Sequence, residues 1–249
     1  CRPMLKLLKH FGLYFMMMNK VISIPEKWQA FRTQLILELE KIGINSLGIV
    51  LFISFFVGGV VSIQTALNLQ NALLPKYLIG LASRDALILE FSPTMIALIL
   101  AGKVGSSIAS ELGSMRVSEQ IDALEIMGVN SASFLILPKI IASILFFPFL
   151  VILSMGTGMI GAWVGGLSVN VTTAEFIYGL KYEFISFYVT YAIIKTIFFA
   201  FIVSSISSYF GYHASGGAIS VGRSSTEAVV YSSIFILVFN FILTKILLT

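Results

Sequence analysis

The chain has 249 residues, of which 57% are hydrophobic and only 11% are charged, and its mean hydropathy is +0.97. Soluble domains carry about 25% charged residues, so this composition excludes an ordinary soluble protein and predicts an integral membrane protein. The formal net charge of +4 is small, and we expect no nucleic acid among the partners. The single cysteine, Cys1, excludes an intrachain disulfide and a thiolate metal site.

The first 25 residues are predicted to be an N-terminal cytosolic extension. They do not begin with Met, and their short apolar core lacks a small-residue cleavage site, so they do not match a signal peptide. Part of this extension is a candidate for non-native sequence, with Met4 or one of Met16–Met18 as the candidate start.

The segment Pro25–Lys41 predicts an interfacial helix before the first membrane span. Its apolar residues fall along one helical face, namely Trp28, Phe31, Leu35, Leu39 and Ile42. Its charged residues lie elsewhere on the helix. Such a helix lies along the surface of a membrane leaflet.

Five apolar stretches are long enough to cross a membrane, which takes about 20 residues of helix. They are Ile42–Pro75, Ala86–Ser110, Ile140–Ala174, Phe184–Tyr212 and Ala228–Leu248. The alternating ten-residue pattern of a membrane β-barrel is absent, so the spans are predicted to be helical. The predicted fold is an all-α integral membrane protein.

The basic residues predict the orientation in the membrane. Seven of the 16 Lys and Arg residues precede Ile42, which places the N-terminus in the cytosol by the positive-inside rule. With five spans, the segment Glu111–Asn130 and the turn at Arg223 are then cytosolic, and the segment Ser168–Glu183 lies outside.

The segment Glu111–Asn130 predicts a short amphipathic helix between the second and third spans. Ser118 is the predicted N-cap. The acids Glu119, Asp122 and Glu125 recur at three-residue spacing on one face. The opposite face carries Val117, Ile121 and Leu124. This pattern fits a docking site for a soluble partner, and it equally fits a solvated connector.

No catalytic or metal-binding constellation is visible. The only histidines, His10 and His213, lie in unrelated segments. The stretch Gly217–Ser224 has the spacing of a phosphate-binding loop, but Arg223 replaces its lysine and no strand is predicted before it. We therefore interpret this stretch as a tight turn and expect no cofactor. Gly58, Gly59, Gly102 and Gly105 predict close helix packing.

Several stretches resemble the MlaE/YrbE permease family, the membrane subunits of ABC-type lipid transporters that work with MCE proteins. The resemblance is carried by FFVGGVVSIQ from Phe55, by LEFSPTMIALILAGKVG from Leu89, by AGKVGSSIASELGSMRVSEQIDALEIMGVNSASFLILPKIIA from Ala101 and by KTIFFAFIVSSISSYFGYHASGGAISVGRSSTEAVVYS from Lys195. It covers residues 26–249, which would form the permease domain.

The resemblance implies a homodimer in the bacterial inner membrane that moves lipid, most simply phospholipid, to or from a periplasmic MCE protein and so supports lipid asymmetry of the outer membrane. A separate cytosolic ATPase would supply the energy, and the chain itself would not be an enzyme. The segment Glu111–Asn130 would be the coupling helix that seats in this ATPase. The residues matching the family motif are Glu119, Gln120, Asp122, Ala123, Glu125 and Gly128.

Charged residues inside the spans are costly, so they are candidates for a lipid path or for structural ion pairs. The lipid-path candidates are Gln64, Glu90 and Lys195. Glu90 could line the path, snorkel at the outer boundary or form an ion pair, and a structural pair is favoured for Lys195. Many family members have an Arg before this acid, where this chain has Leu89, so Glu90 lacks its expected partner.

Two other classes of function stay open. An ion-coupled carrier or channel would need no ATPase, but such proteins usually show repeated broken helices or several intramembrane polar residues. A membrane scaffold would leave the segment Glu111–Asn130 without a defined task.

Overall fold

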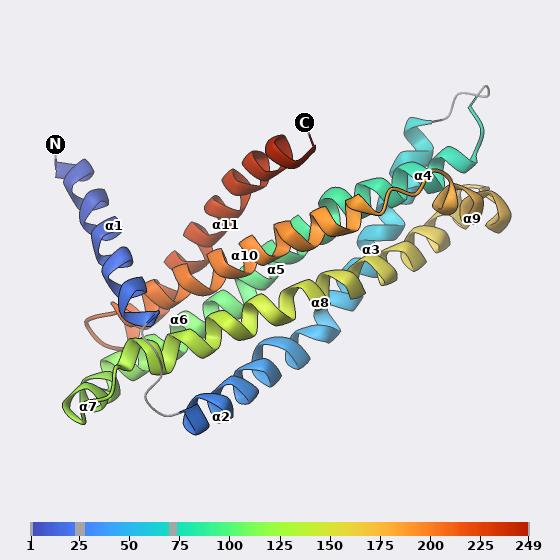
Figure 1. Ribbon diagram of the computed structural model, residues 1–249. Coiled ribbons are helices and arrows are strands. Elements are labelled where there is room, and N and C mark those ends of the chain that lie inside the picture. The colour runs from blue at the N-terminus through green and yellow to red at the C-terminus, as the bar shows by residue number, and fades with distance from the viewer. Residues whose placement is uncertain (1, 23–27, 70–73, 249) are drawn as a thin grey trace. The chain divides into compact units, whose positions relative to one another are not determined.

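A computed structural model describes residues 2–22, 28–69 and 74–248, without the side chains of residues 2–8 and 30 (Figure 1). Every regular element in these residues is a helix. Five helical runs are long and apolar enough to cross a membrane: Phe31–Asn68, Tyr77–Val117, Ser131–Ser168, Phe187–Tyr212 and Ala218–Leu248. The predicted all-α membrane class with five spans is therefore confirmed.

Four of the five helical runs, all but Phe187–Tyr212, begin well before the apolar stretches that predicted them. The third run has 38 residues, and at 1.5 Å per residue it is about 57 Å long, roughly twice the hydrocarbon thickness. The fifth begins at Ala218, ten residues before the predicted Ala228. An apolar stretch marks only the part of a helix that lies in hydrocarbon, so it underestimates helices whose ends continue into water.

The chain divides into two compact units, each made of three stretches of sequence. Unit 1 comprises Cys1–Ile44, Leu100–Ile144 and Ala200–Ile236, and unit 2 comprises Asn45–Ile99, Leu145–Phe199 and Leu237–Thr249. The elements that lie within unit 1 are α1 (Arg2–Val21), α2 (Trp28–Leu39), the π-helical segments η1 (Glu40–Ile44) and η3 (Ala101–Gly105), α6 (Ser106–Val117) and α7 (Gln120–Ile126). Those within unit 2 are α3 (Asn45–Asn68), α4 (Tyr77–Ala86), the π-helical segment η2 (Leu87–Met95) and α9 (Thr173–Lys181). Four helices contribute to both units: α5 (Ile96–Leu100), α8 (Ser131–Ser168), α10 (Phe187–Tyr212) and α11 (Ala218–Leu248).

The N-terminal extension forms a helix, α1, which the sequence did not predict. In unit 1 this helix lies against the C-terminal part of α10 (Figure 1). Nδ1 of His10 is 2.7 Å from the hydroxyl of Tyr209, and the hydroxyl of Tyr14 donates to Ser205 at 2.9 Å. These polar contacts and the buried Val21 fix α1 to the unit.

The predicted interfacial helix is present as α2, but it does not end before the first span. Helical residues run without a break from Trp28 through η1 to Asn68. The predicted apolar face is divided, since Phe31 and Ile42 are buried while Trp28 is exposed. Residues 25–27 of the predicted segment lie outside the described residues, and the position of α2 at a leaflet surface stays a prediction.

Glycines allow α3 and α8 to approach closely in unit 2. A Cβ atom placed on Gly58 would lie 1.9 Å from the carbonyl oxygen of Gly158, and one on Gly59 would lie 3.4 Å from that of Gly161. In unit 1 a Cβ on Gly105 would lie 2.8 Å from Oγ of Ser207. The predicted close packing is thus confirmed at these three positions. It is wrong for Gly102, where no atom lies within 4 Å, because this glycine faces away from the neighbouring helices.

Replacing Gly58 by alanine is expected to destabilise the protein, since the clash is with backbone that cannot rotate away. The cost of such overpacking is about 1 to 3 kcal/mol. Gly48 lies on the same helix with no atom within 4 Å of its Cβ position, so Gly48→Ala is the matched control and is expected to be neutral or stabilising. Thermal unfolding of both purified variants measures the difference, and equal stability would show that α3 and α8 do not pack this closely.

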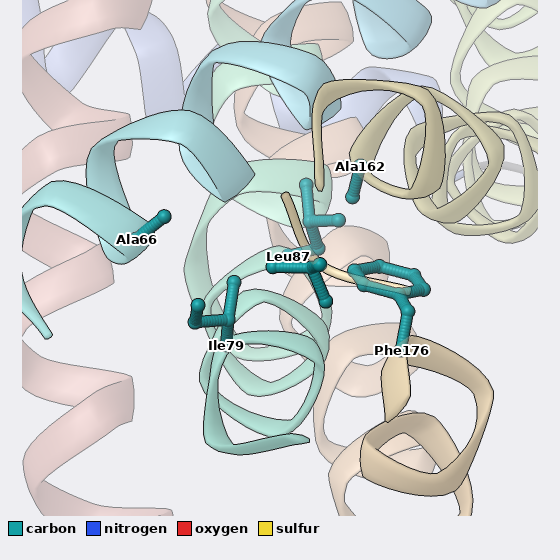
Figure 2. Packing of buried hydrophobic residues seen from close by; sticks show 6 residues of the cluster. Ala66, Ile79, Leu87, Ala162 and Phe176 are labelled. Atoms are coloured by element: carbon teal, nitrogen blue, oxygen red, sulfur yellow. The ribbon is translucent and has the colours of Figure 1, made fainter. Parts of the chain in front are cut away.

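A small apolar core fixes the region of unit 2 that precedes η2. Figure 2 shows Ile79 of α4, Leu87 of η2 and Phe176 of α9 turned toward one another, with Ala66 and Ala162 beside them. The helices α4 and α9 approach through Gly80 and Gly179, whose Cβ positions would lie 2.6 Å and 2.1 Å from backbone oxygens of the other helix. This packing holds the first residue of η2, the segment that carries Glu90.

Candidate functional site

Pro93 interrupts the helix that carries Glu90. Proline has no backbone N–H to donate to the carbonyl of Leu89, four residues before it, and the segment around it is π-helical. Nζ of Lys195 lies 3.3 Å from this carbonyl oxygen. Lys195, from α10, therefore contacts a backbone carbonyl of this π-helical segment inside the span. Single π-helical turns within α-helices occur often at functional sites.

Glu90 and Lys195 form an ion pair in unit 2, with 2.8 Å between Oε2 and Nζ. The other carboxylate oxygen of Glu90 accepts from the hydroxyl of Thr94 at 3.0 Å and from the side-chain amide of Asn240. Lys195 also donates to the hydroxyls of Tyr191 and Thr244, at 3.0 Å and 3.3 Å. We call these six residues the Glu90 cluster.

The two charges of the Glu90 cluster differ sharply in exposure. The side chain of Lys195 is 0% exposed, whereas that of Glu90 is 46% exposed. A fully buried ammonium group needs its counter-ion, because an uncompensated charge in low dielectric is strongly destabilising. Glu90 thus stabilises Lys195 and at the same time presents a carboxylate edge at the surface of unit 2.

The sequence identified the two charges of this cluster but not its neutral members. Lys195 is the partner of Glu90 that the sequence left unassigned, because the two residues lie 105 positions apart. Asn240 was missed, although an amide in the middle of the apolar stretch Ala228–Leu248 is itself a signal. Gln64 is exposed on α3, and none of the described contacts of the Glu90 cluster includes it.

In unit 1, α7 forms the turn between α6 and α8 (Figure 1). The predicted cap is wrong: Ser118 donates back to the carbonyl of Ser114 at 2.8 Å and so closes α6 instead of starting α7. Glu119 precedes α7 in the left-handed conformation, with φ of 60°, and its side chain makes no capping hydrogen bond. The chain turns at Glu119, so Ser118 belongs to the C-terminal end of α6 and cannot cap α7.

Two of the three acids on the predicted face hold α7 in place. Oδ1 of Asp122 accepts from Nη1 of Arg116 at 2.6 Å. Oε1 of Glu125 accepts from the hydroxyls of Ser131 at 2.8 Å and Tyr212 at 3.0 Å. These hydrogen bonds, that from Ser131 foremost, hold the pKa of Glu125 below its usual range. The acids therefore fasten α7 to α6, α8 and α10.

The end of α7 instead presents apolar side chains. Ile121 is fully buried and anchors the helix, whereas Ile126 and Met127 are 88% and 68% exposed. Gly128 follows in the left-handed conformation, with φ of 76°, and turns the chain toward α8. We call the exposed residues of this region the α7 tip: Glu119, Gln120, Ala123, Glu125, Ile126, Met127 and Gly128. Exposed apolar groups rimmed by polar ones are typical of a protein interface.

Nearly all of the membrane-spanning part of the chain matches a known family. The family model described as Permease MlaE matches residues 35–246. The chain belongs to the MlaE permease family. A probable ABC transporter permease protein of Rickettsia prowazekii is 33% identical over 97% of this chain and 93% of its own length. That of Rickettsia bellii is 36% identical over 85% of this chain and 82% of its own length.

A plant relative carries a more specific name. The chloroplastic protein TRIGALACTOSYLDIACYLGLYCEROL 1 of Arabidopsis thaliana is 36% identical over 84% of this chain and 59% of its own length. This MlaE-family chain is thus a multi-pass membrane protein related to ABC transporter permeases.

The structure of this MlaE-family chain also shows where the two histidines lie. Both histidines contact Tyr209, since Nδ1 of His213 lies 3.0 Å from its carbonyl oxygen, so they are neighbours in space despite their distance in sequence. Burial lowers the pKa of His213. Among the described residues, no group of three or more His, Cys, Asp or Glu side chains could hold a metal.

The stretch with phosphate-loop spacing is mostly helical. Gly216 and Gly217 have φ of 105° and 93° and form the turn, and α11 begins at the next residue. Arg223 therefore projects from a helix, where it pairs with Glu227 at 2.9 Å.

Proposed function

We propose that this chain is the membrane permease subunit of an ABC-type lipid transporter, with residues 26–249 as its permease domain. Two copies form a homodimer in the bacterial inner membrane, a separate cytosolic ATPase docks on the α7 tip, and lipid passes between the membrane and a periplasmic MCE-domain protein. Family membership supports the ABC transporter class, and the name of the plant relative supports a glycerolipid substrate.

The observation that carries this proposal is the α7 tip. Ile126 is 88% exposed at a turn of unit 1, outside the apolar stretches predicted to lie in hydrocarbon. Leaving such a group in water is unfavourable by about 25 cal/mol per Å² of apolar surface, and a partner's groove recovers this free energy. Because Asp122 and Glu125 bind Arg116 and Ser131, the apolar end is presented in one orientation.

The Glu90 cluster supports a path for polar headgroups. A lipid that leaves a bilayer brings a charged or zwitterionic headgroup with it, and this headgroup needs polar groups in its path. The exposed edge of Glu90 offers a carboxylate, which pairs with the buried Lys195. Gln64 is also exposed in unit 2 and is proposed to line the same path.

Reconstitution tests this function directly. The chain is purified from native membranes with the proteins that accompany it, and the complex is placed in phospholipid vesicles. ATP-dependent movement of fluorescent phospholipid out of the vesicles is expected, and mass spectrometry of the co-purified lipids identifies the natural substrate. Ion conduction by the chain alone, with no ATP-dependent lipid movement, would support an ion-coupled carrier instead.

Cysteine labelling tests the proposed orientation. Ser215 lies in the turn before α11, is exposed, and serves as the labelling position on the proposed cytosolic side. With Cys1 changed to Ser, Thr173→Cys on α9 is expected to react with an impermeant thiol reagent in intact spheroplasts. Ser215→Cys is expected to react only after the membrane is opened. Equal labelling of both cysteines in intact spheroplasts would overturn a cytosolic N-terminus with five spans.

A further inference from the structure

Four charged side chains of unit 1 form a network beside the hairpin that carries α7. Nζ of Lys139 on α8 lies 2.5 Å from Glu38 on α2 and 2.9 Å from Glu111 on α6. Lys41 of η1 binds the same carboxylate oxygen of Glu111 at 2.5 Å. We call these residues the Lys139 network. It connects three separate stretches of the chain.

The centre of this network is fully buried. Lys139 is 1% exposed and Glu38 is 2% exposed. Oε2 of Glu38 is buried with no hydrogen-bond partner among the described residues, which adds to the cost of burying the pair. Apolar side chains of similar volume often stabilise such a site as well or better. Stability alone therefore does not account for charges here, and the geometry that they impose is the remaining explanation.

The ion pairs fix the relative position of α6 and α8, the two helices that form a hairpin with α7 at its turn. Helix α6 leads into α7 and α8 leads out of it, and the bond from Lys139 to Glu111 ties these arms together. The bond from Lys139 to Glu38 ties the same point to α2, which continues along the chain into the first membrane span. A displacement of α7 is then shared by α6, α8 and α2, because ion pairs of fixed length resist bending of the hairpin.

We propose that Lys139 is a positioning residue that makes the hairpin rigid, so that movement of α7 by the ATPase is transmitted to α2. This inference rests on the proposed function, in which an ATPase docks on the α7 tip. Without the network, the ATPase still binds and hydrolyses ATP, but the hairpin flexes and fewer lipids move per ATP.

The test replaces the buried pair by apolar residues in the double variant Glu38→Leu/Lys139→Met. The complex of this variant with its ATPase is reconstituted, and lipid movement and ATP hydrolysis are measured together. We expect a folded protein that binds the ATPase normally and moves roughly two- to thirtyfold less lipid per ATP, the range over which residues of a coupling network act. The control Glu227→Leu/Arg223→Met makes the same change at an exposed ion pair of unit 1 and is expected to leave this ratio unchanged.

Each outcome decides the inference. An unchanged ratio of lipid to ATP in a stable double variant would show that the network is only structural. A second variant, Glu38→Gln/Lys139→Gln, removes both charges and keeps polar side chains that can form hydrogen bonds; if both double variants fail to fold, the network serves folding and the positioning role is overturned. If the unmodified chain captures no ATPase, the proposed function fails first, and this inference fails with it.

Discussion

Replacing Glu90 by leucine is expected to destabilise the protein by about 3 to 5 kcal/mol, the cost of leaving a buried charge without its counter-ion. Lys195 is 0% exposed, and after the substitution its positive charge would keep only neutral partners, among them the hydroxyls of Tyr191 and Thr244. Thermal unfolding of the purified variant in detergent or lipid discs measures the loss.

An exposed ion pair provides the control for this substitution. The side chain of Glu227 is 39% exposed, close to the 46% of Glu90, but its partner Arg223 is 81% exposed. Exposed pairs contribute about 0 to 1 kcal/mol, so Glu227→Leu is expected to change stability little. Equal effects of the two substitutions would show that Lys195 does not depend on Glu90.

A double variant separates the structural role of Glu90 from a role in transport. Glu90→Leu/Lys195→Met removes both charges and is expected to recover most of the stability lost in the single variant. If Glu90 lines the lipid path, this stable double variant still moves less lipid than the unmodified protein. Normal transport by the double variant would leave the Glu90 cluster with a structural role only.

Replacing both apolar residues of the α7 tip by aspartate is expected to prevent docking of the ATPase. Buried interface anchors contribute about 2 kcal/mol or more each, so Ile126→Asp/Met127→Asp removes about 4 kcal/mol and is expected to weaken binding by roughly several hundredfold. Both side chains are exposed in the described structure, so the substitutions should leave folding of the chain intact. Binding of the purified ATPase to the chain in lipid discs measures the effect.

Ile219 is the matched control for this surface. It is 91% exposed at the start of α11, also in unit 1, and Ile219→Asp makes the same chemical change on α11 instead of α7. We expect it to bind the ATPase normally. Charge reversal of Glu119, Asp122 and Glu125 is a weaker test, because two of these acids hold α7 to Arg116 and Ser131. Loss of binding in the Ile219 variant alone would move the docking site to α11.

The membrane class and the five spans could be predicted because they depend on composition and on the length of apolar stretches, which are local properties. The ends of the helices could not. Helix α11 begins at Ala218. Its first ten residues include the charged Arg223 and Glu227, so a search for apolar stretches does not find this part of the helix. The helix α1 was missed for a related reason: its contacts with Ser205 and Tyr209 join residues 191 and 199 positions apart.

The candidate sites were only partly predictable from spacing. Three-residue periodicity correctly places Asp122 and Glu125 on α7, but it cannot tell an acid that faces a partner from one that binds Arg116. Likewise, Glu90 and Lys195 stand out as charges in apolar stretches, whereas their pairing depends on how η2 and α10 pack. Lys139 was not predicted to be a buried site residue, because a lysine near the end of a span is usually solvated. Its burial is visible only in three dimensions.

The most direct measurement is the protein composition of the complex that tagged chain brings from native membranes. Our account predicts that a nucleotide-binding ATPase co-purifies with the unmodified chain and with Ile219→Asp, together with an MCE-domain protein. It also predicts that the ATPase is lost, while the MCE-domain protein stays, in Ile126→Asp/Met127→Asp. Isolation of the unmodified chain without an ATPase, or equal capture of the ATPase by all three forms, would contradict it.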